Sequence, residues 1–293
     1  MQRPADVRYV DVRYVEVGGG GRLWAELVPA TGPAPAEPLL LVMGANASSR
    51  GWPDELVVRL AERHPVLRYD HRDTGRSSAV LDEQPYGITD LAADAIAVLD
   101  AFDVPRAHAV GMSMGGLLVQ LLLLDHPDRL ASAVLFCTGP LPTPDGPIAP
   151  GPDAALLRRW AELDDPRDEA GELAWRIEHW RLLNGPDVPF DPAEFRVLEE
   201  RVIAHAGTAQ AATAHARMDT DGLLRGAELA HVTVPRLVIE APADPAFPPP
   251  NAQLLVDAIG SGELARIPGM GHAMPAAVIT PLAEAILSGT ADR

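Results

Sequence analysis

The stretch best suited to chemistry is the pentapeptide Gly111-Met112-Ser113-Met114-Gly115, which has the form G-x-S-x-G. An apolar run, residues 107–110, precedes it, and a helix-like apolar run, residues 115–124, follows it. A serine on a sharp turn from a buried strand to a helix is held in strained geometry, and small neighbours let the chain turn. We therefore predict that Ser113 is a nucleophile at the sheet edge. The alternative, a glycine-rich packing turn, is disfavoured by both flanks.

A serine nucleophile needs a base to take its proton and an acid to orient that base. Where this turn occurs, the acid and then a histidine follow in the chain, each on a loop after a late strand. Asp244 follows an apolar run that ends at Glu240, and His272 follows one that ends at Ile267. We predict a triad of Ser113, Asp244 and His272. Glu240 is the competing acid, but its strand position directs it along the sheet.

Eight other histidines compete with His272 for the role of base. Five of them lie in or beside predicted strands and loops, where structural or solvated roles are expected: His64, His71, His108, His126 and His231. Three more, His179, His205 and His215, are expected at exposed helix positions, with a substrate contact as the alternative. His272 alone follows a late strand within a glycine-rich turn, so it is the predicted base.

Two backbone N–H groups should bind the oxyanion that forms at the substrate carbonyl. We predict Met114, directly after the nucleophile, and Ala45, in the turn after the third strand. Loss of one such donor typically costs about 2.7–4 kcal/mol of barrier. The candidate substrate contacts are Asn46, Trp52, Trp175 and Trp180, although tryptophans at helical spacing more often belong to a core.

Apolar runs and helical periodicity alternate along most of the chain, which predicts a mostly parallel eight-stranded sheet with helices on both faces. The expected strands are residues 8–16, 23–28, 39–43, 66–69, 107–110, 133–136, 236–240 and 263–267. The expected helices are residues 54–62, 88–102, 114–124, 251–259 and 281–287. Residues 69–77, rich in charge and glycine, are interpreted as a turn locked by local Asp and Arg hydrogen bonds.

The alternation stops after a Pro/Gly-rich stretch, residues 139–147, which cannot pair as a strand. Residues 153–183 and 191–206 then show helical spacing. This predicts a core domain of residues 1–139 and 231–293 and a helical lid of residues 140–230. Near the N-terminus, Asp6–Val10 is repeated as Asp11–Val15, and one copy is expected to be a dispensable extension.

Composition excludes several classes of protein. Of 293 residues, 47% are hydrophobic, and all 24 basic residues are arginine, which rules out a Schiff-base lysine or a Walker-type phosphate loop. The net charge of −17 argues against nucleic acid as a partner. Cys137 is expected at a buried, inert strand position. We see no signal peptide, and the longest apolar stretch is too short for a bilayer, so we expect a cytoplasmic protein that binds no membrane.

With these three residues in this order, the chain resembles the α/β-hydrolase superfamily. Residues 41–46, 51–55, 68–77 and 267–273 resemble one branch, the aclacinomycin methylesterases and related enzymes of anthracycline biosynthesis, and residues 181–185 and 188–191 extend the likeness into the lid. The resemblance implies hydrolysis of a carbomethoxy ester on an aromatic polyketide, without metal or cofactor. It also implies Ser113 as nucleophile, His272 as base and Asp244 as orienting acid, with Ala45 and Met114 as oxyanion donors.

Two other functions stay open at this point. One is a broader acyl hydrolase that acts on lactones or thioesters or resembles a perhydrolase. The other is a noncatalytic scaffold of the same fold that binds a small hydrophobic ligand. For the main interpretation we expect a small-molecule ester as the partner and a monomer or weak homo-oligomer.

Overall fold

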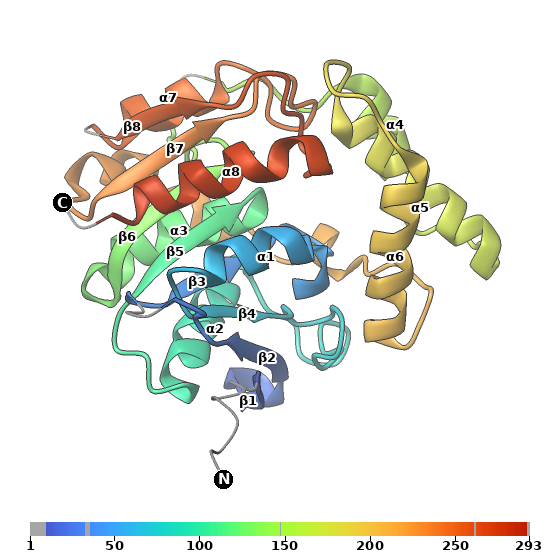
Figure 1. Ribbon diagram of the computed structural model, residues 1–293, viewed down its shortest axis with the longest axis horizontal. Coiled ribbons are helices and arrows are strands. Elements are labelled where there is room, and N and C mark those ends of the chain that lie inside the picture. The colour runs from blue at the N-terminus through green and yellow to red at the C-terminus, as the bar shows by residue number, and fades with distance from the viewer. Residues whose placement is uncertain (1–9, 33–35, 147, 261, 292–293) are drawn as a thin grey trace, which may run out of the picture.

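A computed structural model describes residues 10–32, 36–146, 148–260 and 262–291. Within these residues an eight-stranded sheet has the order β1-β2-β4-β3-β5-β6-β7-β8 (Figure 1). Its strands are β1 Asp11–Glu16, β2 Arg22–Val28, β3 Leu39–Val42, β4 Val66–Tyr69, β5 Ala107–Met112, β6 Leu130–Phe136, β7 Arg236–Glu240 and β8 Glu263–Arg266. The mostly parallel eight-stranded sheet predicted from the alternation is confirmed.

The direction of each strand follows from its pattern. Every residue of β3, β4, β5, β6 and β7 is buried, as expected for parallel strands covered on both faces. The glycine-rich turn at residues 18–20 joins β1 to β2 as an antiparallel hairpin, and β2 is also antiparallel to β4. The second copy of the tandem repeat forms most of β1. The first copy lies outside the described residues except for Val10.

Helices cover the sheet in two layers. Residues of α1 (Asp54–Ala61) and α8 (Ala276–Gly289) belong to one apolar core, and residues of α2 (Ile88–Ala101), α3 (Met114–Asp125) and α7 (Asn251–Ala258) belong to the other. The predicted start of the last helix at Pro281 was wrong. Although proline favours a first turn, burial of Val278 and Ile279 extends α8 to Ala276.

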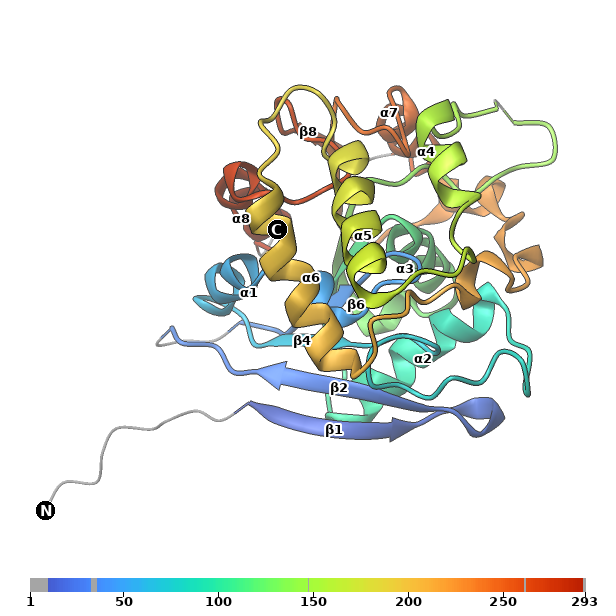
Figure 2. The ribbon, with the colours of Figure 1, turned by 90° about the vertical axis from the view of Figure 1, so that its right-hand side faces the viewer.

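Three helices lie along one side of the molecule, apart from the two layers: α4 (Ala154–Trp160), α5 (Glu169–Asn184) and α6 (Pro192–Ala206). We call them the lid helices; they face the viewer in Figure 2. The helical spacing expected over residues 153–183 is divided between α4 and α5 by a turn at residues 161–168. Only a small apolar cluster, around Leu156, Leu183 and Phe195, is buried beneath them.

The structure also bears on membranes. In the described part of the chain, no helix combines the length and apolar character that crossing a bilayer requires.

Candidate active site

The turn at Ser113 has the strained geometry that the pentapeptide predicts. Ser113 lies between β5 and α3 with φ 57° and ψ −125°, and it is half-buried. Both glycines are required sterically: a Cβ on Gly111 would lie 2.5 Å from the Gly115 carbonyl oxygen, and a Cβ on Gly115 would lie 2.0 Å from that of Val42. A non-glycine residue at positive φ is rare and persists where surrounding structure over-determines it. Such strain is typical of a functional position.

Asp244 and His272 lie on the loops after β7 and β8 and form a hydrogen-bonded pair. His272 Nδ1 lies 2.9 Å from Oδ2 and 3.1 Å from Oδ1 of Asp244. The N–H groups of Ala246 and Phe247 also donate to Oδ1, at 2.7 and 2.9 Å. Burial opposes ionisation of this carboxyl, but the His272 charge and these hydrogen bonds outweigh it, so the pKa of Asp244 lies below its usual value. Asp244 is therefore an anion, and in this form it orients the His272 imidazole.

The loop that carries His272 is fastened to the end of a lid helix. The N–H groups of His272 and Ala273 both donate to the Leu183 carbonyl, at 2.7 and 3.2 Å. A Cβ on Gly271 would lie 2.2 Å from the Asn184 carbonyl oxygen, so this close approach requires glycine. The C-terminal end of α5 thus sets the position of the imidazole.

The link from the imidazole to the serine is open in this structure. Ser113 Oγ makes no hydrogen bond to another described residue, and His272 is 7% exposed. Hydrogen bonds between catalytic groups are often long in free enzymes and tighten when substrate binds. The imidazole–carboxylate half of the predicted triad is formed, and the role of Ser113 stays a prediction.

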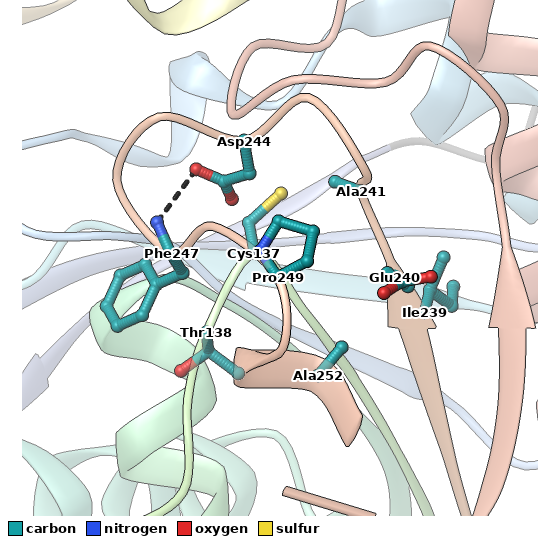
Figure 3. Close-up of a pocket in the computed structure, with 9 residues that line it drawn as sticks. All are labelled: Cys137, Thr138, Ile239, Glu240, Ala241, Asp244, Phe247, Pro249 and Ala252. Carbon is teal, nitrogen blue, oxygen red and sulfur yellow. Dashed lines mark hydrogen bonds between the residues drawn. The ribbon is translucent and has the colours of Figure 1, made fainter. Parts of the chain in front are cut away.

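Cys137 lies beside the carboxylate of this pair. It follows β6 with φ 51°, outside the strand where it was expected, and its sulfur points toward Asp244 (Figure 3). Its thiol lies 3.6 Å from the Gly271 carbonyl oxygen, and burial raises its pKa well above the usual value, with a further rise from Asp244. The expectation of a buried cysteine is confirmed, and the group is a protonated thiol.

A cavity of about 10 Å³ adjoins Asp244 and Cys137. It is about the size of one water molecule, far too small for a substrate. The Thr138 hydroxyl lines it and has no hydrogen-bond partner among the described residues.

Three side chains with potential metal-ligating atoms meet at the same place. The donor atoms of Cys137, Asp244 and His272 lie within 4.8 Å of one another. Metal binding would require both a deprotonated thiol and loss of the Nδ1 proton that joins His272 to Asp244. The raised pKa of the thiol and the imidazole–carboxylate bond both oppose this, so the trio fits acid–base chemistry better than a metal.

The predicted oxyanion loop, residues 43–46, packs against Ser113, the predicted nucleophile. A Cβ on Gly44 would lie 3.1 Å from Ser113 Cβ, and Ala45 is exposed. Asn46 has φ 57° and pairs twice with His215: its N–H donates to Nδ1 at 2.8 Å, and its Oδ1 accepts from the His215 N–H at 3.1 Å. The backbone of Met114 is buried at the start of α3. The two predicted donors stay predictions, and the loop geometry suits them.

Sequence reasoning was wrong about His215 and His205, which were expected at exposed helix positions. Both are buried, at 6% and 7% exposure. His205 Nε2 lies 2.7 Å from Asp70 Oδ2, and His215 Nε2 donates to the Arg72 carbonyl at 3.0 Å. The partners come from loops more than 130 residues away, so no local pattern could reveal them.

The segment of residues 69–77 is a locked turn, as predicted, and it also reaches the oxyanion loop. Asp70 accepts from the Ser49 N–H and from the Arg76 N–H, both at 2.8 Å. His71 Nε2 lies 3.0 Å from the Met43 carbonyl oxygen. Because a carbonyl only accepts, Nε2 carries the proton. The contact between His71 and Met43 was missed from the sequence.

The tryptophans predicted as substrate contacts are held by structural partners. Trp52 has no exposed surface and packs 6.0 Å from the Phe136 ring, centroid to centroid, in the core. Trp175 is 6% exposed and lies between the guanidinium groups of Arg159 and Arg167. A ligand would have to displace these neighbours to touch either ring.

Trp180 and Asn46 are the more accessible of the four predicted contacts. Trp180 stacks on Phe195 with centroids 5.4 Å apart, and its Nε1 donates to Glu199. Beside it, His179 accepts from Trp160 Nε1 at 3.0 Å. Burial and then the charge of His272 lower the pKa of His179 to about 4. A neutral imidazole on a lid helix therefore lies within electrostatic reach of His272.

A larger cleft, of about 430 Å³, lies between the turn that precedes α5 and the segment that follows α6. None of the predicted catalytic residues lines it.

The competing acid Glu240, the last residue of β7, is paired with Arg266 on the neighbouring strand β8.

Comparison with known proteins agrees with this geometry. A family model described as alpha/beta hydrolase fold matches residues 37–275. The rhodomycin D methylesterases DauP of Streptomyces sp. strain C5 and DnrP of Streptomyces peucetius are 45% and 44% identical to this chain. Each alignment covers 92% of this chain and 94% of the relative.

Solved structures agree as well. The crystal structure of a hydrolase from Pseudomonas aeruginosa is 26% identical, with a TM-score of 0.69, and the match covers 96% of this chain and 99% of that one. The family expected from the motifs is confirmed: the chain belongs to the α/β-hydrolase fold family.

Proposed function

We propose that this protein is a serine carboxylic ester hydrolase that removes the methyl group of a carbomethoxy ester on an anthracycline-like polyketide. One observation carries the chemistry: a strained serine in G-x-S-x-G combined with a buried imidazole 2.9 Å from an ionised carboxylate. The substrate class is supported by two relatives, named rhodomycin D methylesterases, at 44–45% identity over nearly the whole chain. We expect it to act in the cytoplasm as a monomer or weak homo-oligomer.

The reaction proceeds in two steps. His272 accepts the Ser113 hydroxyl proton while Oγ attacks the ester carbonyl, and the N–H groups of Ala45 and Met114 stabilise the oxyanion. The tetrahedral intermediate collapses, the carbon–methoxy bond breaks, and His272 returns the proton to the leaving methoxide, which departs as methanol. Water then attacks the acyl-enzyme while His272 accepts its proton. The bond between the acyl carbon and Ser113 Oγ breaks, His272 returns the proton to Oγ, and the carboxylic acid is released.

The lid helices, within the proposed lid of residues 140–230, cover the site. Because the Leu183 carbonyl holds the His272 loop, we propose that the lid positions the base as well as selecting the substrate. Trp180 on α5 and Asn46 in the loop after β3 remain the proposed substrate contacts.

The test is direct hydrolysis of anthracyclines that carry a carbomethoxy group, with methanol and the free acid both quantified. We expect one methanol per acid released, and none from Ser113→Ala. If short acyl esters or lactones turn over with higher kcat/KM than every carbomethoxy polyketide tested, the broader acyl hydrolase is the better assignment. Absence of a fluorophosphonate adduct on Ser113 favours the noncatalytic scaffold.

A further inference from the structure

The loop that supplies the proposed Ala45 donor contains three successive peptide groups, and the outer two each bond to a histidine. The first includes the Met43 carbonyl, which accepts from His71 Nε2 at 3.0 Å. The third includes the Asn46 N–H, which donates to His215 Nδ1 at 2.8 Å. The middle peptide carries the Ala45 N–H. Because each peptide group is planar, anchoring both outer planes restricts rotation of the middle one.

The loop is strained and close to the nucleophile, so its anchoring matters. Asn46 is held at φ 57°, in the left-handed region that residues other than glycine rarely adopt. The second bond, from the His215 N–H to Asn46 Oδ1, holds the same residue through its side chain. Gly44 lies against Ser113: a Cβ on residue 44 would lie 3.1 Å from Ser113 Cβ. Rotation of this loop would therefore be felt at the reacting centre.

The two imidazoles form a buried pair with the proton on Nε2 in both rings, and they contact the loop through different nitrogens. They are 1% and 6% exposed, and their centroids lie 5.7 Å apart. At residue 71 the essential atom is a donor, Nε2–H. At residue 215 the essential atom is an acceptor, Nδ1, because Nε2–H donates to the Arg72 carbonyl. Burial lowers the pKa of both rings, which keeps them neutral and these roles intact.

We infer that His71 and His215 are positioning residues for catalysis: they clamp residues 43–46 so that the Ala45 N–H points at the developing oxyanion. The inference rests on the proposed oxyanion role of Ala45. Neither histidine touches substrate, and His215 comes from the segment after the lid helices, 169 residues from its partner. The clamp therefore couples the lid region to the oxyanion hole.

Substitution by asparagine or glutamine can test the roles of the two ring nitrogens separately. Asparagine places an amide atom one bond from Cγ, where Nδ1 lies, and glutamine places one two bonds away, near Nε2. At residue 215, His215→Asn keeps an acceptor for Asn46 and His215→Gln does not. At residue 71 the order reverses, since His71→Gln keeps a donor for Met43 and His71→Asn does not.

We expect His215→Gln and His71→Asn to lower kcat about 10-fold to 100-fold with KM nearly unchanged, because an oxyanion donor acts mainly in the transition state. His215→Asn and His71→Gln should recover most of that loss. The rate at which a fluorophosphonate labels Ser113 should follow the same order. Arg217→Met is the matched control: it lies two residues beyond His215 and removes an exposed ion pair to Asp82. It should leave kcat unchanged.

Circular dichroism and thermal unfolding identify variants that fail to fold, and the two positions are tested separately so that one can fail without the other. The inference is overturned if wild type is labelled and active while Asn and Gln rank in the same order at both positions, or equal wild type. If Ser113 of wild type takes no label, the proposed serine mechanism is overturned, and this inference with it.

Discussion

The loops at the carboxyl ends of β5, β7 and β8 and the lid helices are stabilised by different forces. The strands β5 and β7 are fully buried, so Ser113 and Asp244 stand on a close-packed base. Strand β8 is largely exposed, but Ile267 and Met270, which lie between β8 and His272, belong to the same core. The lid helices bury few apolar residues and are joined by ion pairs and by guanidinium–tryptophan contacts. This contrast indicates that substitutions in the loops should cost chemistry, and substitutions in the lid should cost stability and substrate binding.

The largest expected effect is on the loop side. Ser113→Ala should lower kcat at least about 10⁴-fold, since removing the nucleophile leaves only binding and electrostatic contributions. The midpoint of thermal unfolding should change little, because Ser113 Oγ makes no hydrogen bond to a described residue. Methanol release measures the first quantity and calorimetry the second. Retained turnover would remove Ser113 from the mechanism.

Asp244→Asn should be nearly as severe, with a drop in kcat of about 10³-fold to 10⁴-fold, because a neutral amide neither fixes the tautomer of His272 nor stabilises its cation. The KM for the ester should stay close to that of wild type. Steady-state kinetics on one carbomethoxy substrate check both values. A nearly silent variant would show that another acid orients the imidazole.

The lid side is tested at Arg176 on α5, which pairs with Glu199 on α6 and with Glu172 one turn earlier on α5. These three side chains are 7–12% exposed. Arg176→Met leaves the buried Glu199 carboxylate without its cation, while Glu172 keeps its pair with Arg167. We expect a loss of about 3 kcal/mol in unfolding free energy. Hydrogen exchange over residues 169–206 should rise more than exchange in β5. Equal changes in both regions would erase the distinction between lid and core.

His215 joins the segment after the lid helices to the loop after β3, and it should make the unfolding free energy sensitive to acid. Burial, and then the charge of the nearby His71, lower the pKa of His215 in the folded protein to about 3. As the pH falls, the unfolded chain is therefore protonated at His215 before the folded chain is. The stability that neutral His215 contributes is complete above about pH 6.5 and is lost as the pH falls toward 3. At pH 5 the loss relative to pH 8 that is due to His215 should be about 2 kcal/mol. Urea unfolding should therefore show a loss about 2 kcal/mol larger in wild type than in His215→Asn, because the lowered pKa values of His71 and His179 contribute equally in both proteins.

The smallest effect serves as a control for Arg176. Arg181 and Glu178 form an exposed pair on α5, at 51% and 44% side-chain exposure. Arg181→Met should change the unfolding free energy by less than about 0.5 kcal/mol, because solvent and salt screen such pairs. A loss as large as that of Arg176→Met would mean that burial does not determine how much each ion pair of the lid helices contributes to the unfolding free energy.

Local pattern was sufficient for the strands and for the turn at Ser113. Each depends on neighbours within a few residues: apolar runs bury strands, and Gly111 and Gly115 leave room where a Cβ would collide with backbone. The predicted elements therefore differ from the observed ones mainly at their ends. Pro281, inside α8, is the exception in which burial of neighbouring residues outweighed a local preference.

Contacts between distant segments could be known only from the folded chain. His215 was expected at an exposed helix position, yet it bonds to Asn46, and the Leu183 carbonyl receives two N–H groups from the His272 loop. Trp52 and Trp175 have the composition of ligand contacts but are enclosed by the core and by two arginines. The physical reason is that a hydrogen bond or a ring contact depends on position in space, and in these cases the partners are brought together by packing of elements that are remote in the chain.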